Sequence, residues 1–452
     1  MALPKFLSLF LVILATAGHQ ISVSLASPTN FAPLLPSDGI KGAYWPSWLA
    51  ETLPPSTIPT SYFTHLFYAF VLADATSYQL FVTQPDDQWM GNFTATLHAK
   101  NPSAKAFLSV GGSNASPYTF SNMVGNSDNR AAFIKSSIDV ARRYGFDGLD
   151  LDWESPNNQQ DMSNLAVFFR EWRASVNKES LASGRPRILL SAADYFASKF
   201  FLADVPWTYP GDAIKNYVDF LNPMCYDYRD GWDTTVTGSP ALLYDNSSNI
   251  STSFGISSWI EDGVPSKKLV MGMPMYGKTW QLKDANVHGI GAPANGTGPG
   301  NGGIMSYDDI VAFNLANGAN VVYDNDTVST YSYAGTNWIG YDDPTSITNK
   351  VKYAKDQGLG GSYCFLGNER KGKEEEHLVI PALEIFHSWS PLTAQKKYPR
   401  SPRACAYTIF TVVDLTSSYP IHEVPETEYM DMVAESYTTV TLVSLLNFST
   451  SE

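Results

Sequence analysis

Short apolar runs alternate along the chain, from Ile40 onward, with longer segments in which apolar residues recur at helical spacing. The runs are apolar nearly throughout, as expected for parallel strands that are covered on both faces. They are Ile40–Tyr44, His65–Leu72, Ala104–Gly112, Phe146–Glu154, Arg187–Asp194, Tyr217–Tyr226, Lys268–Tyr276 and Leu359–Phe365. The helical segments include Asn129–Tyr144, Met162–Ser183, Ser253–Glu261 and Thr345–Gln357. These eight repeats predict an α/β fold, a (β/α)₈ TIM barrel.

The connection between the seventh and eighth runs is far longer than the few residues that usually link two elements. Within it, Ser306–Asn317 has helical spacing. Three further stretches are strand-like: Val321–Tyr323, Val328–Tyr333 and Trp338–Tyr341. We therefore expect a small α+β insertion between strands 7 and 8, on the rim where long loops deepen a binding cleft.

The predicted organisation divides the chain into successive parts. Residues 1–26 form a signal peptide, 38–275 hold barrel strands 1–7, and 276–341 form the α+β insertion. Residues 342–390 contain strand 8 and end the barrel, which could be incomplete there, and 391–452 form an atypical, poorly ordered tail. The tail could bind a partner, but it has neither helical nor strand periodicity, which favours an extension without a packed structure.

The N-terminal residues have the pattern of a secretory signal. Lys5 supplies the positive start, Phe6–Ala15 the apolar core and Ser24–Ala26 a cleavage site between small residues. Ala15–Ala17 is an earlier candidate for cleavage, and the apolar core is too short to span a bilayer. The Asn-x-Ser/Thr sequons begin at Asn92, Asn114, Asn246, Asn249, Asn295, Asn325 and Asn447. We expect a secreted glycoprotein, extracellular or vacuolar, although a single sequon is weak evidence.

Composition narrows the class of partner. Aromatic residues make up 13% of the chain and charged residues only 16%, which suits stacking on flat ligands such as sugar rings. The net charge of −14 argues against nucleic acid and against anionic membrane surfaces, and we attribute it to solubility. Cys225, Cys364 and Cys405 provide no disulfide framework, although Cys364 and Cys405 could pair. We expect a monomer with no cofactor and no metal.

The run Phe146–Glu154 carries the strongest chemical signal. Successive side chains of a strand alternate between two faces, so Asp150, Asp152 and Glu154 share one face while the opposite face is apolar. Like charges at this spacing raise one another's pKa values. A solvated acidic edge strand is the alternative, but its apolar face would still need a partner layer. The pattern indicates a function for these carboxylates.

The carboxyl ends of the strands build the active site of a TIM barrel. Glu154 closes strand 4, with Asp152 and Asp150 below it. Other strand ends carry further candidate side chains: Ala69–Phe70, Ser109–Gly112, Met224–Tyr228 and Met275–Lys278. We expect these segments to meet around Glu154.

Together these motifs resemble glycoside hydrolase family 18, and most closely its plant class V chitinases. The family signature Asp-x-x-Asp-x-Asp-x-Glu is present as Asp147, Asp150, Asp152 and Glu154. The other matching motifs are Ser109–Gly112, then Met224 with Tyr226 and Asp227, then Gly272–Trp280 and Trp338–Asp343. The resemblance runs from about Ile40 to Phe365, with the motifs in the family's order.

The resemblance implies retaining hydrolysis of β-1,4-linked N-acetylglucosamine polymers, endo- or exo-acting. In this family the substrate's own acetamido oxygen attacks the anomeric carbon. Glu154 would be the general acid and later the base, with its pKa raised by Asp150 and Asp152. Asp152 would orient the acetamido group. Tyr226 would hydrogen-bond the acetamido oxygen, Asp227 would support the sugar and Glu154, and Asp147 would be structural.

Substrate contacts are also expected at the strand ends. They are Trp45, Phe70, Met224, Asp227, Arg229, Tyr276 and Phe365. Trp45, Phe70, Tyr276 and Trp280 are the candidates for stacking on sugars, although the composition of a core would account for each of them taken alone. Arg229 could instead form a surface ion pair. Phe365 stands where the family has a Trp that floors subsite −1, and it offers a smaller face with no N–H donor. The eighth helix must be built from a segment such as Ile380–His387, or be missing.

Two alternatives remain beside the enzyme. The first is a chitinase-like lectin that binds chitin oligosaccharides, which the altered strand 8 favours and the intact Glu154 and Asp152 oppose. The second is the ectodomain of a receptor, which we rank last because the sequence contains no membrane-spanning segment.

Overall fold

The computed structural model describes residues 39–201, 206–230 and 233–365, with the side chain of residue 365 left out. The predicted signal peptide, the tail and the segment proposed for an eighth helix lie outside these residues, as do Asn447 and Cys405. Cys225 and Cys364 are buried free thiols.

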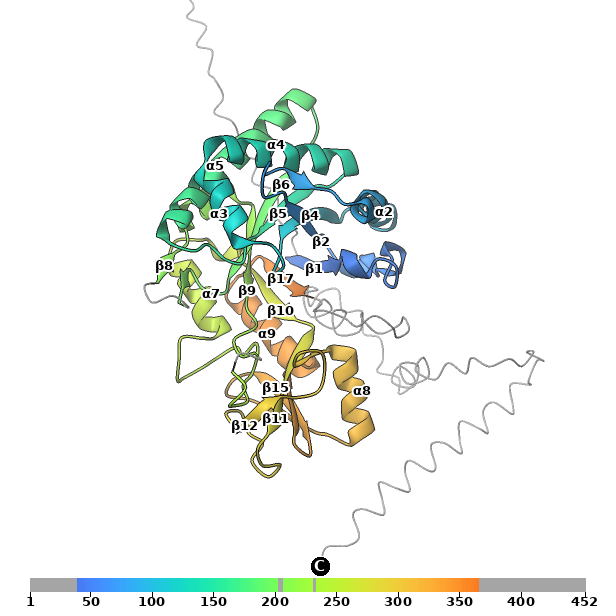
Figure 1. Cartoon of the computed structure of the whole chain (residues 1–452), viewed down its shortest axis with the longest axis vertical. Coiled ribbons are helices and arrows are strands. Elements are labelled where there is room, and N and C mark those ends of the chain that lie inside the picture. Colours follow the sequence, from blue (N-terminus) through green and yellow to red (C-terminus); the bar gives the residue numbers. More distant parts are fainter. Residues whose placement is uncertain (1–38, 202–205, 231–232, 366–452) are drawn as a thin grey trace, which may run out of the picture. The chain divides into compact units, whose positions relative to one another are not determined.

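Parallel strands form a TIM barrel, which confirms the predicted fold (Figure 1). Its strands are β1 (Ile40–Pro46), β2 (His65–Ala73), β4 (Lys105–Gly111), β5 (Gly148–Asp152), β6 (Leu189–Tyr195), β9 (Phe220–Met224), β10 (Val270–Pro274) and β17 (Gly361–Phe365). They pair in the order β10-β17-β1-β2-β4-β5-β6-β9. An isolated parallel bridge between Leu221 and Leu269 brings the two ends of this order together.

Helices lie on the outside of the barrel, and most of them begin at a residue whose side chain caps the first turn. They are α2 (Gln84–Lys100), α3 (Pro117–Gly125), α4 (Ser127–Tyr144), α5 (Gln159–Ser183), α6 (Gly211–Tyr217), α7 (Thr252–Glu261) and α9 (Pro344–Asp356). In α9, Asp343 and Ser346 form a capping box around Pro344 at the first turn. The sequence placed Tyr217 at the start of a strand, which is wrong: it ends α6, and β9 begins at Phe220.

The long connection after β10 forms a second, antiparallel sheet with one helix, over the range predicted for the insertion. Its elements are β11 (Tyr276–Leu282), β12 (Ala294–Thr297), β13 (Ile304–Ser306), α8 (Tyr307–Asn317), β14 (Asn320–Asp324), β15 (Ser329–Ala334) and β16 (Asn337–Tyr341). The sheet order is β12-β11-β16-β15-β14, with β13 on β11. Trp280 and Trp338 form its own small core.

The remaining short elements are loop structures and small hairpins. They are η1 (Ser47–Leu49), η2 (Pro55–Thr57), η3 (Thr60–Tyr62), η4 (Ser266–Lys268), β3 (Leu80–Phe81), β7 (Lys199–Phe200) and β8 (Trp207–Thr208). The strand β3 pairs antiparallel with the end of β2, so this hairpin extends beyond the barrel sheet.

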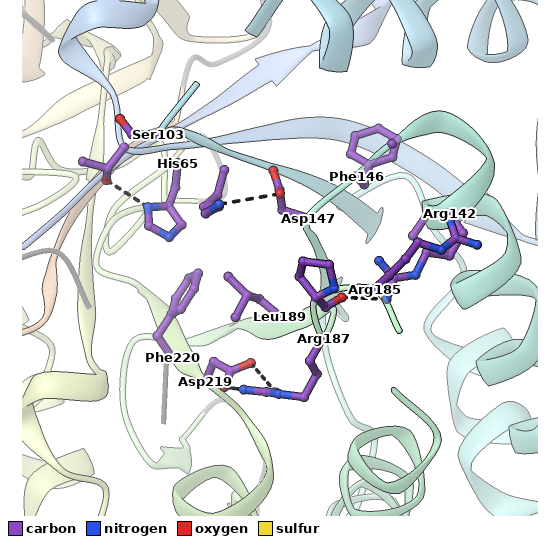
Figure 2. A pocket seen from close by; sticks show the side chains of 15 residues that line it. His65, Ser103, Arg142, Phe146, Asp147, Arg185, Arg187, Leu189, Asp219 and Phe220 are labelled. Atoms are coloured by element: carbon purple, nitrogen blue, oxygen red, sulfur yellow. Dashed lines mark hydrogen bonds and ion pairs between the residues drawn. The ribbon is translucent and has the colours of Figure 1, made fainter. Parts of the chain in front are cut away.

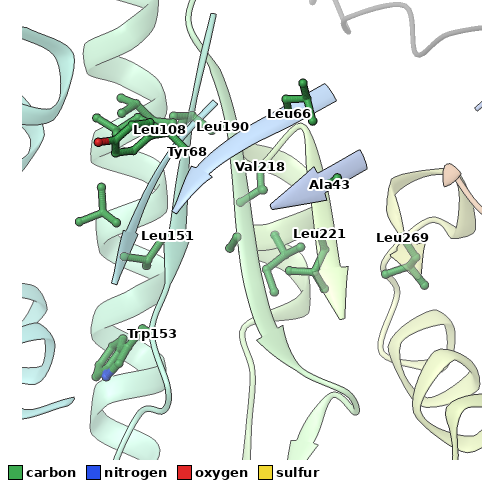
Figure 3. Close-up of a cluster of buried hydrophobic side chains, with 14 of the residues drawn as sticks. Ala43, Leu66, Tyr68, Leu108, Leu151, Trp153, Leu190, Val218, Leu221 and Leu269 are labelled. Carbon is green, nitrogen blue, oxygen red and sulfur yellow. The ribbon is translucent and has the colours of Figure 1, made fainter. Parts of the chain in front are cut away.

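Each barrel strand buries both of its faces. Leu151 and Trp153 pack outward with Leu108 and Leu190 in the large core between strands and helices (Figure 3). A separate aromatic cluster fills the inside of the barrel: Tyr44, Phe67, Phe107, Phe220 and Tyr363. Because the inner face of β5 meets this cluster, its carboxylates lose contact with water, and each is stabilised only where other strands supply hydrogen bonds.

A cavity of about 620 Å³ lies at the N-terminal end of the strands, opposite the end where β5 delivers Glu154 (Figure 2). His65 and Phe220 line it, and Asp219 accepts a charged hydrogen bond from Arg187 beside it at 3.1 Å. Asp147 is also in its lining and pairs with His98 at 2.8 Å, so the structural role predicted for Asp147 fits. This end of a TIM barrel serves stability.

Candidate active site

The strand β5 places Asp150 and Asp152 inside the barrel, and Glu154 follows just beyond its end. The register sets Asp150 level with Ser109 on β4 and with Ser191 on β6. Paired residues of neighbouring parallel strands share a face, so both serines also point inward. The chain thus brings polar groups from three adjacent strands to one level.

Asp150 is the fixed base of the site. Its carboxylate accepts hydrogen bonds from Tyr44 Oη at 2.9 Å, Ser109 Oγ at 2.7 Å and Ser191 Oγ at 2.6 Å. Burial raises its pKa, and these three donors act in the opposite direction. Tyr44 is itself held by Asn222, whose amide donates to the phenol oxygen at 2.9 Å.

Asp152 is buried, yet its Oδ1 atom has no hydrogen-bond partner among the described residues. Its pKa is raised well above the usual value, first by burial and then by the charges of Glu154, Asp150 and Asp194. Asp152 and Glu154 therefore titrate as a pair. A buried acceptor without a donor is costly in the free protein and is suited to receive an N–H group from a ligand.

Glu154 is exposed to solvent at the carboxyl end of the barrel. Its pKa is raised to about 7, first because surrounding protein displaces water and second because of the charge of Asp227. The raised pKa was predicted correctly, and the predicted repulsion between Asp152 and Glu154 is present. The sequence did not indicate the two causes that act most on Glu154, which are the displacement of water by the surrounding protein and the charge of Asp227. A carboxyl group with a pKa near 7 can both donate and accept a proton at neutral pH.

Asp227 connects the barrel to the second sheet. It follows β9 with a positive φ of 58° and accepts a hydrogen bond from Tyr276 Oη at 2.9 Å. The buried Lys278, also on β11, lies 3.1 Å from Asp227 and 2.8 Å from Asp230. Burial raises the pKa of Asp227, whereas Lys278 and Tyr276 lower it. The insertion therefore supplies the groups that hold one carboxylate of the site.

Tyr226 presents a hydroxyl that stays protonated. Its Oη lies 3.1 Å from Tyr363 Oη, and Tyr363 donates to the carbonyl oxygen of Pro223 at 3.3 Å. Burial, together with Tyr363 and Tyr276, raises the pKa of Tyr226 well above its usual value. At neutral pH, Tyr226 is thus a neutral hydrogen-bond donor.

Two of the predicted stacking residues are wrong, and a third is buried. Trp45 is only 2% exposed and packs outward against Tyr68 and Phe93, so it cannot reach a ligand in the barrel. Trp280 lies in the core of the second sheet. Tyr276 is buried as well, and its contribution is the hydrogen bond to Asp227.

The other predicted contacts lie at the carboxyl ends of strands. Phe70 and Met224 are half-buried, at the ends of β2 and β9. Arg229 is exposed and pairs with Asp233 at 3.3 Å, which is the alternative that the sequence left open. The backbone of Phe365, in β17, pairs with that of Tyr44 in β1. The role predicted for the side chain of Phe365 lies outside the described atoms.

Sequence reasoning missed Trp48, which is 46% exposed in η1 and stacks on Phe70 with ring centroids 6.3 Å apart. Trp48 follows the end of β1, so its position on the rim was available as a signal. Tyr363 and Lys278 were also missed, because their contacts join elements that are remote in sequence.

Asp194 is a further buried carboxylate that sequence reasoning did not single out. It lies on the outer side of β6, and its Oδ2 atom finds no partner within the described part of the chain. Burial and the charge of Asp150 raise its pKa to about 8. The protonated form of Asp194 is therefore favoured at neutral pH.

Among residues 39–201, 206–230 and 233–365, no group of three His, Cys, Asp or Glu side chains is arranged to hold a metal ion. No helix in these ranges is both long and apolar enough to cross a membrane.

The chain is similar to known proteins along most of its length. The family model described as Glycosyl hydrolases family 18 matches residues 41–366. A class V chitinase of Medicago truncatula is 44% identical over 363 residues, which cover 80% of this chain and 94% of the relative. A class V chitinase of Lotus japonicus is 47% identical over 326 residues, 72% of this chain and 81% of that relative. The crystal structure of a GH18 chitinase from Cycas revoluta in complex with (GlcNAc)3 superposes with a TM-score of 0.72 at 38% identity, covering 78% of this chain and 100% of the other.

Proposed function

The chain belongs to glycoside hydrolase family 18, and on this premise we propose that it is a chitinase that hydrolyses β-1,4-linked N-acetylglucosamine polymers. The observation that carries the proposal is the pair at the end of β5. Glu154 is accessible with a pKa of about 7, and beside it Asp152 is buried with an acceptor oxygen that lacks a donor within the described residues. The naming of the curated relatives as chitinases supports the same substrate class.

In the first step, protonated Glu154 gives its proton to the glycosidic oxygen as the bond to the anomeric carbon breaks. The acetamido carbonyl oxygen of the same sugar attacks that carbon and forms an oxazolinium ion. In the second step, ionised Glu154 takes a proton from a water molecule whose oxygen bonds to the anomeric carbon. The bond from that carbon to the acetamido oxygen breaks, which opens the oxazolinium ring and restores the acetamido group. Two displacements at one carbon retain its configuration.

Asp152 and Tyr226 have the properties that this nucleophile requires. The acetamido N–H can donate to the free acceptor of Asp152, whose carboxylate then stabilises the positive charge of the oxazolinium ion. The Tyr226 hydroxyl remains a donor at neutral pH and suits the acetamido oxygen. Asp150, with its three donors, keeps the strand interior fixed below them.

The lectin alternative is not favoured. Binding alone needs no accessible carboxyl group with a pKa of about 7, and this group is present in Glu154. The simplest loss of turnover would replace Glu154 or Asp152, and both remain.

The test is product release from (GlcNAc)4, with the anomeric form of the first product followed by NMR. We expect β-anomers first, and a fall of about 10²- to 10⁴-fold in rate for Glu154→Gln. The fully deacetylated glucosamine tetramer should not be cleaved, because it lacks the attacking oxygen. Equal inactivity of wild type and Glu154→Gln, or initial α-anomers, would contradict the proposal.

We also propose that the protein is secreted as an N-glycosylated monomer. The six sequon asparagines within the described residues are exposed: Asn92, Asn114, Asn246, Asn249, Asn295 and Asn325. The apolar core that follows Lys5 supports export. Expression in a eukaryotic host, with N-terminal sequencing and glycosidase treatment of the medium, tests both points; retention in the cell would contradict them.

A further inference from the structure

The hairpin of β2 and β3 carries an exposed apolar pair beside the proposed cleft. Leu72 on β2 pairs with Phe81 on β3, and these side chains are 40% and 57% exposed. The barrel register of β2 with β4 ends at Val71, so this pair lies beyond the barrel sheet.

The alternation of side chains determines which way this pair faces. An irregularity in the pairing of β2 with β4 lies between Tyr68 and Val71. After it, Val71 packs outward in the core between strands and helices, whereas Phe70 packs against the inner aromatic cluster. Leu72 therefore shares the side of Phe70, and Phe81, opposite Leu72 in an antiparallel pair, shares it too.

Contacts connect this face to the catalytic residues. Phe70 stacks with Trp48, and a Cβ atom placed on Gly112 would lie 2.8 Å from the Phe70 ring. The N–H of Gly112 donates to the carbonyl oxygen of Asp152 at 2.9 Å. A continuous path of neighbouring residues thus leads from Asp152 past Phe70 to the hairpin.

We propose that Trp48, Phe70, Leu72 and Phe81 form a strip that binds the part of a β-1,4-linked N-acetylglucosamine chain that extends out of the cleft. The inference rests on the proposed function and goes beyond it, because Leu72 and Phe81 lie outside the barrel and away from the site of cleavage. Sugar rings present apolar faces that pack on aromatic and aliphatic side chains. The hairpin would therefore matter for long chains and for insoluble chitin, and little for short oligomers.

The size of the strip favours a polysaccharide over a protein partner. A stable protein interface buries about 800 Å² on each partner, from roughly 20–30 residues. The exposed part of the strip consists of Trp48, Leu72 and Phe81, which are too few for such an interface and enough to contact a narrow chain.

The test compares Leu72→Ser and Phe81→Ser with Leu181→Ser, a control at an 87% exposed leucine near the end of α5. Binding to insoluble chitin and hydrolysis of chitin and of (GlcNAc)4 are measured for each purified protein. For Phe81→Ser we expect roughly three- to tenfold weaker chitin binding, and a similar fall in the ratio of polymer to tetramer activity. Leu72→Ser should act in the same direction, and Leu181→Ser should keep the wild-type ratio.

The outcomes separate this inference from the proposed function. Suppose that the wild type cleaves the tetramer and the Phe81→Ser protein keeps the wild-type chitin binding and activity ratio. The proposed role of the strip is then wrong, and the proposed chitinase activity still stands. If the wild type cleaves neither substrate, the proposed function fails. Loss of chitin binding in Phe81→Ser would still support the strip in that case. Circular dichroism confirms that each variant is folded.

Discussion

Buried carboxylates have cation partners at one end of the barrel and like-charged neighbours at the other. At the N-terminal end of the strands, Asp219 pairs with Arg173 at 2.8 Å and with Arg187 at 3.1 Å. At the C-terminal end, Asp152 is buried without a cation partner among the described residues and faces the charge of Glu154. The same strands thus carry compensated charge at one end and like charge at the other. A fold does not need the second arrangement, so the C-terminal end is where stability is given up for chemistry.

Asp152→Asn, at the catalytic end of the barrel, should have the largest effect on activity. The amide keeps the volume but removes the charge that stabilises the oxazolinium ion, so we expect hydrolysis of (GlcNAc)4 to fall by about 10²-fold or more. The free energy of unfolding should stay equal or rise, because a crowded carboxyl group is removed. Parallel rate measurements and urea titrations check both halves. A large loss of stability would show that Asp152 is structural.

Asp194→Asn should show directly how much the buried carboxyl group of Asp194 lowers the free energy of unfolding. The folded pKa of about 8 lies above the usual 3.8, so the folded state binds a proton that the unfolded state releases between these values. The contribution of Asp194 to the stability of the wild type therefore falls as pH rises from about 4 to about 8. The gain from Asn should be absent at pH 4 and grow toward pH 8, by up to about 1.4 kcal/mol per pKa unit. Urea titrations across this range measure it; a gain independent of pH would contradict a neutral Asp194.

Asp219→Ala, at the N-terminal end of the strands, should change stability and leave activity unchanged. The change leaves Arg173 and Arg187 without their partner, and we expect a loss of about 3 kcal/mol, since both keep some solvent contact. The rate per folded molecule should not change. Lys352→Ala is the control, because its pair with Asp356 is exposed and screened by water, so its loss should leave the free energy of unfolding nearly unchanged. A loss of activity without a loss of stability in Asp219→Ala would reverse the roles assigned to the two ends.

The barrel and the inward carboxylates were predictable because they depend on local patterns. Alternation along 146–154 placed Asp150 and Asp152 on one face, and the structure agrees. The same rule, applied to β1, would have corrected Trp45: Tyr44 bonds inward to Asp150, so its neighbour must face outward. The prediction failed there because it used distance from the strand end and ignored parity.

The contacts of Glu154 with charged residues on other elements could not be predicted from the sequence. Besides Asp152, the carboxyl group of Glu154 is affected by the charge of Asp227, which lies on a different strand end. Asp227 is in turn held by Lys278 from the second sheet. Nothing in the spacing of these residues reveals that the inserted sheet folds against the end of β9. Contacts between elements so remote in sequence follow from tertiary packing, which local periodicity does not encode.

The smallest predicted effect tests whether Asp227 sets the working pH. Asp227 raises the pKa of Glu154, which must be protonated for the first step, so activity should decline as pH rises through about 7. Asp227→Asn removes this charge, so the alkaline limb of kcat/KM should move to lower pH. The shift should be less than about one unit, because the displacement of water contributes more to the raised pKa of Glu154 than Asp227 does. Asp230→Asn is the matched control: Asp230 also binds Lys278 but does not act on Glu154, so its limb should stay in place even if the rate falls. If both variants moved the limb equally, the shared cation Lys278 would control the proton of Glu154, and the charge of Asp227 would not.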